Sequence, residues 1–141
     1  MRKSPKRDVK IKINGRLTEK AQVSNSVANA FLSIASANYR VLIEHDVGIP
    51  IGCGLGSSGA GALGSAFALN EAHGLGFSKI EAAQAAHVAE VRCKTGLGTV
   101  IAELSGGLEI RVKPGAPGIG EVKTVKVDGD YVAVCLPFGP M

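Results

Sequence analysis

A glycine-rich stretch at residues 50–60 holds the residue types best suited to chemistry. It reads Pro-Ile-Gly-Cys-Gly-Leu-Gly-Ser-Ser-Gly-Ala. Because glycine has no Cβ atom, this backbone can adopt positive φ angles and approach a ligand closely. A helix is predicted to begin at Ser57, and its free N–H groups and its dipole would favour an anion. The stretch therefore predicts a cradle for an anion such as phosphate.

Two hydroxyl groups, on Ser57 and Ser58, follow the glycines. They can cap the helix, or they can bind phosphate oxygens or a metal ion. The stretch has no Lys-Ser/Thr pair of the Walker type. A capped turn without a ligand is the alternative interpretation. The full spacing from Pro50 to Ser58, between a predicted strand and a predicted helix, favours phosphate.

Glu90 is the best candidate for a metal-binding carboxylate. Phosphoryl transfer needs such a group to hold magnesium beside the phosphates. Glu90 lies near the end of a predicted helix over residues 79–92, three residues after His87. A solvated helix glutamate is the alternative for Glu90, and a packed or capping histidine is the favoured interpretation of His87. A second glycine turn follows at residues 95–99.

The order Pro-x-x-x-Gly-Leu-Gly-Ser-Ser at residues 50–58 resembles the signature of the GHMP kinases, which include galactokinase, homoserine kinase and mevalonate kinase. The resemblance implies ATP and Mg²⁺ as cofactors and a small-molecule substrate. It also implies that Ser58 and Glu90 share the magnesium ion. The residues that would hold the nucleotide are Pro50, Gly52, Gly54, Leu55, Gly56, Ser57, Ser58, Gly59 and Ala60.

The second glycine turn departs from the family pattern at Thr99. Counting back from the Gly106–Gly107 pair, many GHMP kinases have an aspartate here that serves as the catalytic base. A threonine hydroxyl cannot act as a base near neutral pH. Phosphoryl transfer depends mainly on positioning and electrostatics, however, and homoserine kinases are thought to work without this aspartate. The resemblance thus places Thr99 at the catalytic position. It assigns the lining of the acceptor pocket to Thr95, Gly96 and Gly98.

Four motifs in order resemble those of archaeal members of the family that phosphorylate pantoate. They lie at residues 49–64, 86–91, 95–98 and 114–118. This closer match implies transfer of the γ-phosphate of ATP to pantoate on the route to coenzyme A. Homoserine kinase or another GHMP kinase is the alternative, as is a catalytically incomplete nucleotide-binding fragment.

The resemblance also predicts the domain organisation. Residues 9–141 would form an incomplete N-terminal, ATP-binding domain of a GHMP kinase, because the segment that opens that domain and the family's C-terminal domain do not appear. Residues 1–8 would be a basic tail or the scar of a truncation.

Hydrophobic periodicity predicts the elements that position these motifs. The expected fold class is α+β, a two-layer arrangement with a mixed sheet packed against helices. The resemblance implies the N-terminal domain of a GHMP kinase, whose fold is similar to one in ribosomal proteins. Strands are predicted at 8–14, 39–46, 108–112, around 122–127, and at 131–136 after a hairpin turn at 128–130. Helices are predicted from Thr18 until Asn38 closes the first one, at 57–73 and at 79–92.

The helix faces can also be predicted from this periodicity. The first helix would bury Val23, Val27, Ala30, Phe31 and Ile34. The third would bury Ile80, Ala83, Ala86, Val88 and Val91, and Ser78 with Glu81 would form a capping box at its start.

Bulk properties set the remaining limits. The chain has 141 residues, 45% of them hydrophobic and 20% charged, which is typical of one globular domain. No apolar run reaches membrane-spanning length and no signal peptide is evident, so a cytoplasmic protein without membrane partners is expected. The net charge of +4 owes much to residues 2–7, but no aromatic residues interleave there, which argues against nucleic acid. An RNA-contacting domain is a minor alternative, and homodimer formation through an exposed apolar face is a hypothesis.

Overall fold

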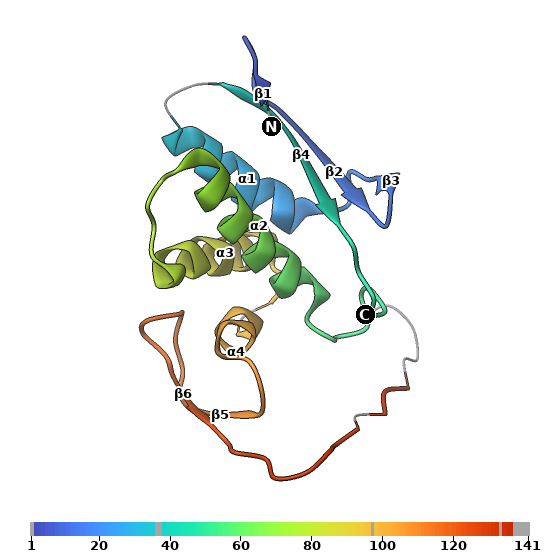
Figure 1. The fold of residues 1–141 in the computed structure, drawn as a ribbon, viewed down its shortest axis with the longest axis vertical. Helices are drawn as coiled ribbons and strands as arrows, with labels where there is room; N and C mark the ends of the chain where they lie inside the picture. The colour runs from blue at the N-terminus through green and yellow to red at the C-terminus, as the bar shows by residue number, and fades with distance from the viewer. Residues whose placement is uncertain (1, 36–37, 97, 133, 137–141) are drawn as a thin grey trace.

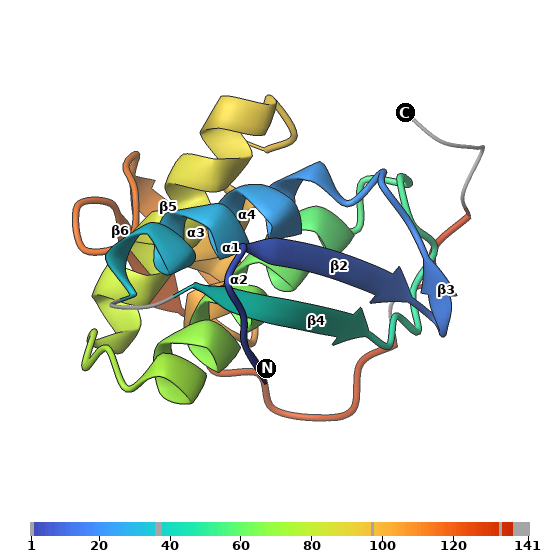
Figure 2. The same cartoon turned by 90° about the horizontal axis from the view of Figure 1, so that it is seen from above.

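The computed structural model describes residues 2–35, 38–96, 98–132 and 134–136. A sheet forms one layer and the helices form the other, as Figures 1 and 2 show from two directions. The sheet has the order β1-β4-β2-β3. Its strands are β1 (Arg2–Lys3), β2 (Asp8–Ile13), β3 (Arg16–Leu17) and β4 (Tyr39–His45). This confirms the predicted α+β class with a mixed sheet.

The two long strands, β2 and β4, pair in parallel. Both were predicted, and each ends one residue earlier than expected. A parallel pair needs a crossover connection, and the helix α1 (Gln22–Ile34) provides it. Alternation along the strands turns Ile11 and Val41 into the core, while Lys10 and Lys12 lie on the other face. The sheet thereby fixes the position of the end of β4, which lines the same pocket as the glycine loop.

The first helix begins four residues later than predicted, at Gln22 instead of Thr18. The Thr18 hydroxyl does not cap a helix: it accepts a hydrogen bond from the Lys20 amide at 3.1 Å in a local turn. The Thr18 amide donates to the Ile11 carbonyl at 3.0 Å, which extends the strand pairing. The helix also ends at Ile34, before Asn38. Thr18 was expected to begin the helix because it precedes a helical pattern. Its hydrogen bonds to the local backbone stabilise a turn instead.

The helices α2 (Ser57–His73) and α3 (Lys79–Cys93) confirm the two predicted helices that flank the site. The predicted capping box is present, since the Ser78 amide donates to Glu81 at 2.8 Å and the Glu81 amide donates to the Ser78 hydroxyl at 3.2 Å. Small residues on α2, among them Ala62 and Ala66, are fully buried. They let α2 pack closely against its neighbours.

The predicted inward faces were partly wrong. On α1, Val23, Val27 and Phe31 are buried as expected, Ala30 is half-buried, and Ile34 is exposed. On α3, Ala83 and Ala86 are buried, but the larger Ile80, Val88 and Val91 are exposed. The residues that do face inward on α3 are Ala82, Ala83, Ala86, Ala89 and Glu90. Compared with the predicted orientation, α3 is rotated about its own axis, because its alanine face fits closely against α1 and α2. This rotation buries Glu90.

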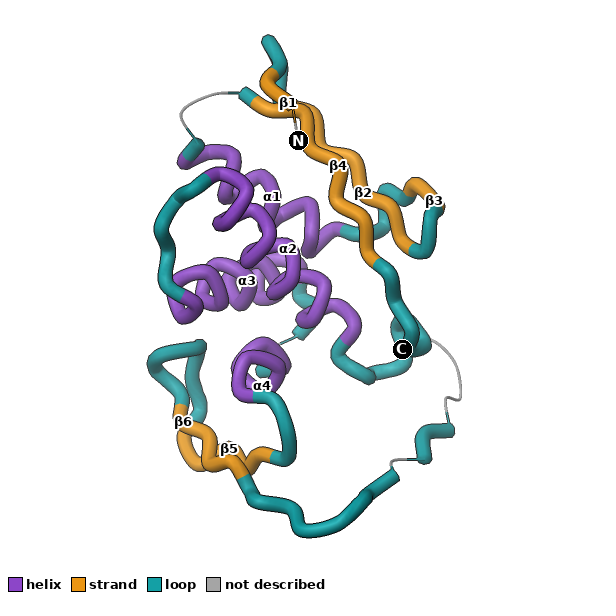
Figure 3. Tube along the Cα trace, in the orientation of Figure 1, coloured by secondary structure: helices purple, strands orange, loops and turns teal. Residues whose placement is uncertain are grey.

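The second half of the chain contains a short helix and a hairpin. The helix α4 (Thr99–Ser105) occupies the apolar run after the second glycine turn, to which no secondary structure had been assigned. Strands β5 (Glu109–Lys113) and β6 (Glu121–Thr124) form an antiparallel pair. The predicted strand around residues 122–127 is therefore confirmed only up to Thr124. Figure 3 shows this hairpin and the four-stranded sheet at opposite ends of the helical layer.

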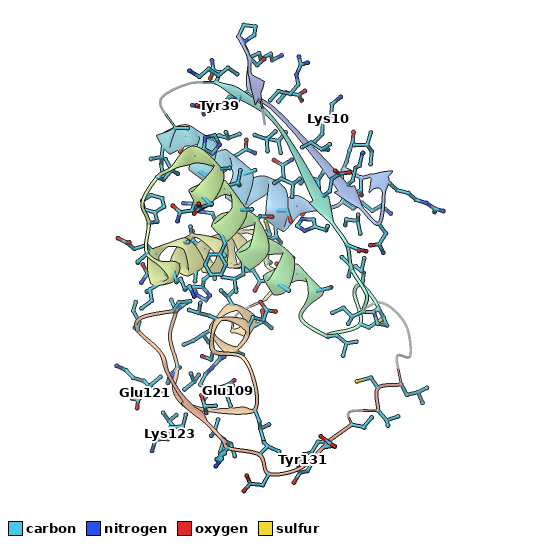
Figure 4. The ribbon with its side chains drawn as sticks, in the orientation of Figure 1. Lys10, Tyr39, Glu109, Glu121, Lys123 and Tyr131 are labelled. Carbon is cyan, nitrogen blue, oxygen red and sulfur yellow. The ribbon has the colours of Figure 1, made fainter. Side chains whose placement is uncertain are left out.

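The predicted strand at residues 131–136 and the hairpin turn before it were wrong for the residues that the structure describes. Residues 131, 132 and 134–136 form no strand, and position 133 lies outside the described residues. Tyr131 is 77% exposed and Val134 is 93% exposed. Figure 4 places Tyr131 on an extended segment away from the helices. A continuous apolar run becomes a strand only where a neighbouring strand accepts its hydrogen bonds, and the described part of the chain offers this segment none.

Candidate functional site

The glycine loop forms one wall of a pocket with a volume of about 820 Å³. Gly52, Gly54 and Gly56 all have positive φ angles, 76°, 75° and 78°. The opposite walls come from the start of α1 and the end of β4, and Glu90 on α3 also lines the pocket. Most of the loop residues expected to bind a nucleotide lie together here: Gly52, Gly54, Gly56, Ser57, Ser58, Gly59 and Ala60. Pro50 and Leu55 are not part of the pocket wall.

The N-terminus of α2 is open at this pocket. Gly56 is the N-cap residue in the left-handed conformation, and the described residues provide no side-chain cap hydrogen bond to the helix. The capped-turn alternative requires a serine side chain to accept hydrogen bonds from the first amides of α2. Neither Ser57 nor Ser58 does so. Uncapped amides and a helix dipole form a favourable site for an anion, and both serine side chains line the same pocket.

Glu90 is almost fully buried, at 1% exposed, so the interpretation as a solvated helix glutamate was wrong. The Thr99 hydroxyl donates a hydrogen bond to Glu90 Oε2 at 2.8 Å. Thr95 Oγ1 lies 3.5 Å from Glu90 Oε1. A Cβ atom at Gly96 would lie 2.7 Å from Oε2, so the glycine leaves room for the carboxylate. The structure thus brings Glu90, Thr95, Gly96 and Thr99 together.

Of the residues expected to line the acceptor pocket, Thr95 is part of the pocket wall, whereas Gly96 and Gly98 are not. The Arg111 guanidinium of β5 donates a hydrogen bond to the Gly98 carbonyl. A Cβ atom at Gly98 would collide with that guanidinium. This contact ties the second glycine turn to the hairpin.

Glu103 on α4 is a residue that sequence analysis missed. Its two carboxyl oxygens are buried and have no hydrogen-bond partner among the described residues. A Cβ atom at Gly56 would lie 2.7 Å from Glu103 Oε1, and one at Gly59 would lie 2.6 Å from Oε2. Burial, together with the negative charge of Glu90, raises the pKa of Glu103 to about 7, although the nearby Ala60 amide partly opposes the rise. The signal was its spacing of four residues from Thr99, which becomes informative only once residues 99–105 are known to be helical.

The raised pKa of Glu103 predicts a loss of stability as the pH rises. The folded chain keeps this proton up to about pH 7, whereas the unfolded chain releases it near the ordinary value of 4.5. The contribution is fully present below pH 4.5 and is lost as the pH approaches 7. Urea unfolding at a series of pH values should therefore show a decline in wild type that Glu103→Gln removes.

The comparison with Glu103→Gln is needed because His45 acts in the opposite direction. Burial lowers the pKa of His45, so its contribution to stability increases with pH. A second variant, Glu71→Gln, removes an exposed glutamate from α2 and should keep the wild-type profile. Equal profiles for wild type and Glu103→Gln would contradict the raised pKa.

A second polar pair that sequence analysis missed lies on the far wall of the pocket. Ser24 Oγ and His45 Nε2 are 2.9 Å apart, and both residues line the pocket. His45 is the last residue of β4. Because burial lowers the pKa of His45, its ring is neutral at physiological pH and offers a polar but uncharged contact to a ligand.

The residues present fit a magnesium–nucleotide complex. Magnesium prefers oxygen ligands and commonly takes one or two carboxylates together with phosphate oxygens. The Glu90 carboxylate and the Ser58 hydroxyl both line the pocket beside the open end of α2. No group of three or more histidine, cysteine, aspartate or glutamate side chains is placed to bind a metal in the described ranges. Such a donor set suits a magnesium ion that binds together with phosphate groups. It does not supply enough ligands for a site made only of protein side chains.

Comparisons with known proteins agree with this arrangement. The family model for the N-terminal domain of GHMP kinases matches residues 21–107. Pantoate kinase of Thermococcus kodakarensis is 49% identical over 90 residues, which cover 64% of this chain and 29% of that protein. Pantoate kinase of Methanocaldococcus jannaschii is 41% identical over 102 residues, 72% of this chain and 35% of that protein. The chain spans about a third of the length of these curated relatives.

A solved structure is also similar. It is described as a phosphotransferase related to the coenzyme A biosynthesis pathway, with a TM-score of 0.83 and 37% identity. The match covers 91% of this chain and 43% of that one. Among the described residues, no helix has the length and apolar character needed to cross a membrane.

Proposed function

We propose that this chain, which belongs to the GHMP kinase family, is the nucleotide-binding part of a kinase that phosphorylates pantoate with ATP. The product would be 4-phosphopantoate, an intermediate on the route to coenzyme A. Kinases of this family generally use ATP. The names of the similar proteins support the acceptor, since two of them are pantoate kinases and a third is a phosphotransferase of coenzyme A biosynthesis. The proposal places the reaction in the cytoplasm and assigns nucleotide binding to residues 9–141.

One observation carries the proposal: a buried carboxylate, Glu90, lines the same pocket as the uncapped N-terminus of α2. The amides of α2 would bind the phosphates, with Ser57 and Ser58 adding hydroxyl contacts. Glu90 and Ser58 would hold magnesium, which would supply charge neutralisation on the phosphates. The second glycine turn, with Thr95, would line the acceptor side. These groups come from α2, α3 and the second glycine turn, and the packing of α2 against α3 and α4 brings them together.

Thr99 would orient Glu90 and would not take a proton. Its hydroxyl donates to Glu90 Oε2 at 2.8 Å and is not basic at neutral pH. In the transfer, the acceptor oxygen bonds to the γ-phosphorus, the bond to the bridging oxygen of ADP breaks, and the hydroxyl proton leaves to water. Such a reaction depends mainly on alignment and charge stabilisation, so a fixed Glu90 contributes without a general base at residue 99.

Calorimetric titration of ATP with excess magnesium into the chain tests the proposal. We expect binding at about 1 mM or tighter, the range of typical substrate constants. The double variant Ser58→Ala, Glu90→Ala should not bind. A folded wild-type chain that binds no ATP would overturn the proposal. Circular dichroism of both proteins establishes that they are folded.

An acceptor panel then tests the substrate. A longer version that spans the length of the relatives should phosphorylate pantoate faster than homoserine or mevalonate. The homoserine arm matters because Thr99 stands where many relatives have an aspartate. Preference for homoserine would replace the proposed acceptor. ATP binding without transfer to any acceptor would reduce the proposal to a nucleotide-binding module.

A further inference from the structure

Glu103 has no part in the proposed chemistry, yet its carboxyl group lies directly against the proposed phosphate cradle. Its oxygens occupy the space that side chains at Gly56 and Gly59 would fill, on the first turn of α2. They are inaccessible to solvent and make no well-formed hydrogen bond in the parts of the chain that the structure describes, although the Ala60 amide lies close enough to lower the pKa of the carboxyl group. A buried carboxyl group without partners is costly to a protein and calls for a physical explanation.

The charged groups near Glu103 and along the pocket are of both signs. Glu90, from α3, adds negative charge to its environment. At this end α2 presents amides and the Ser57 and Ser58 hydroxyls, which do not ionise near neutral pH. The charged residues of the packed strand β6, Glu121 and Lys123, are exposed on the hairpin (Figure 4). An anion at the N-terminus of α2 would therefore lie beside Glu90 and in front of the buried Glu103, as well as near the favourable amides. Lys20 and Lys94 also line the pocket and would attract either form of the ligand.

We propose that the Glu103 carboxylate makes the phosphate cradle selective for nucleotide bound to a divalent cation over the free polyphosphate anion. This inference rests on the proposed function. Repulsion between a fixed charge and a ligand scales with the charge of the ligand. Free ATP carries a charge of about −4 near neutral pH and its magnesium complex about −2, so Glu103 disfavours the free anion more strongly. Glu103 acts through the cradle without touching the reacting atoms, and it is thus a positioning residue that sets specificity.

The test compares two ligands against wild type and Glu103→Gln by calorimetry. One ligand is ATP with excess magnesium, and the other is ATP with EDTA. At about pH 8.5 the Glu103 carboxylate is mostly ionised, which makes the effect largest. Removing the charge should tighten free ATP about tenfold and the magnesium complex about threefold. The ratio of the two affinities is the readout, because a general disturbance of the cradle would change both alike.

Two further variants serve as controls. Glu71→Gln makes the same change in net charge at the other end of α2 and should leave the ratio unchanged. Glu103→Asp keeps the charge and should keep the preference for the magnesium complex, even if Glu103→Gln proves unstable. Equal gains in affinity for both ligands in Glu103→Gln, or loss of the preference in Glu103→Asp, would overturn this inference. Either result would leave the proposed function intact. If wild type binds neither ligand, the proposed function falls with this inference.

Discussion

Replacing Glu90 with glutamine is expected to weaken the binding of magnesium–ATP by about 100-fold, the equivalent of about 3 kcal/mol of charge stabilisation. Glutamine has nearly the same shape and keeps an oxygen that can accept the Thr99 hydrogen bond, so the fold should survive. It removes the one buried carboxylate that lines the pocket among the described residues. Calorimetry with and without magnesium measures the effect.

The magnesium dependence is the decisive part of the Glu90 experiment. In wild type, magnesium should strengthen ATP binding, whereas in Glu90→Gln it should add little. Glu71→Gln, an exposed change of the same kind on α2, should behave as wild type. If Glu90→Gln kept its full response to magnesium, the carboxylate would be structural and the metal would bind elsewhere.

Replacing Gly56 with alanine is expected to cost about 1–3 kcal/mol of unfolding free energy and to abolish measurable phosphate binding. Gly56 has a φ of 78°, a conformation that disfavours a side chain, and its Cβ atom would lie 2.7 Å from Glu103 Oε1. The Glu103 side chain can shift to make room, but the positive φ strains an alanine here whatever the space, and relief of that strain displaces the loop and the first amides of α2. Urea unfolding measures the first effect, and titration with pyrophosphate measures the second.

A matched control for Gly56 lies on the same helix. Gly64 is in the middle of α2, and a Cβ atom there would meet nothing within 4 Å. Gly64→Ala should therefore stabilise the chain by up to about 1 kcal/mol, because alanine favours helix and restricts the unfolded chain. It should leave phosphate binding unchanged. Similar behaviour of the two variants would mean that the geometry of Gly56 is unimportant.

Local patterns were enough to predict the elements nearest the glycine loop. The loop is bounded by β4 and α2, and α2 has the predicted ends because glycines stop it on both sides. The capping box at Ser78 likewise fixed the start of α3. These signals lie within a few residues of what they determine. Even so, the ligand roles of the loop residues stay a prediction until binding is measured.

Features that depend on packing could not be predicted. The inward face of α3 was misjudged because large apolar residues were assumed to be buried, whereas close packing selected the alanines. That rotation is what buries Glu90. Glu103 was missed for a related reason, since its importance depends on α4 lying across the first turn of α2, which no local pattern reports. The segment at residues 131–136 failed because strand formation requires a partner far along the chain.

The side chains that α2 can carry at residue 59 depend on the side chains that α4 places beside it. A methyl group at this position would lie 2.7 Å from Thr99 Oγ1 and 2.6 Å from Glu103 Oε2, and Thr99 in turn holds Glu90. Residue 59 belongs to α2, but which side chains it accepts is decided by α4. Substitutions at residues 59, 99 and 103 should therefore be non-additive in their effects on stability. An alanine at residue 59 becomes acceptable when α4 carries smaller side chains, so the chain can change here only by coordinated steps.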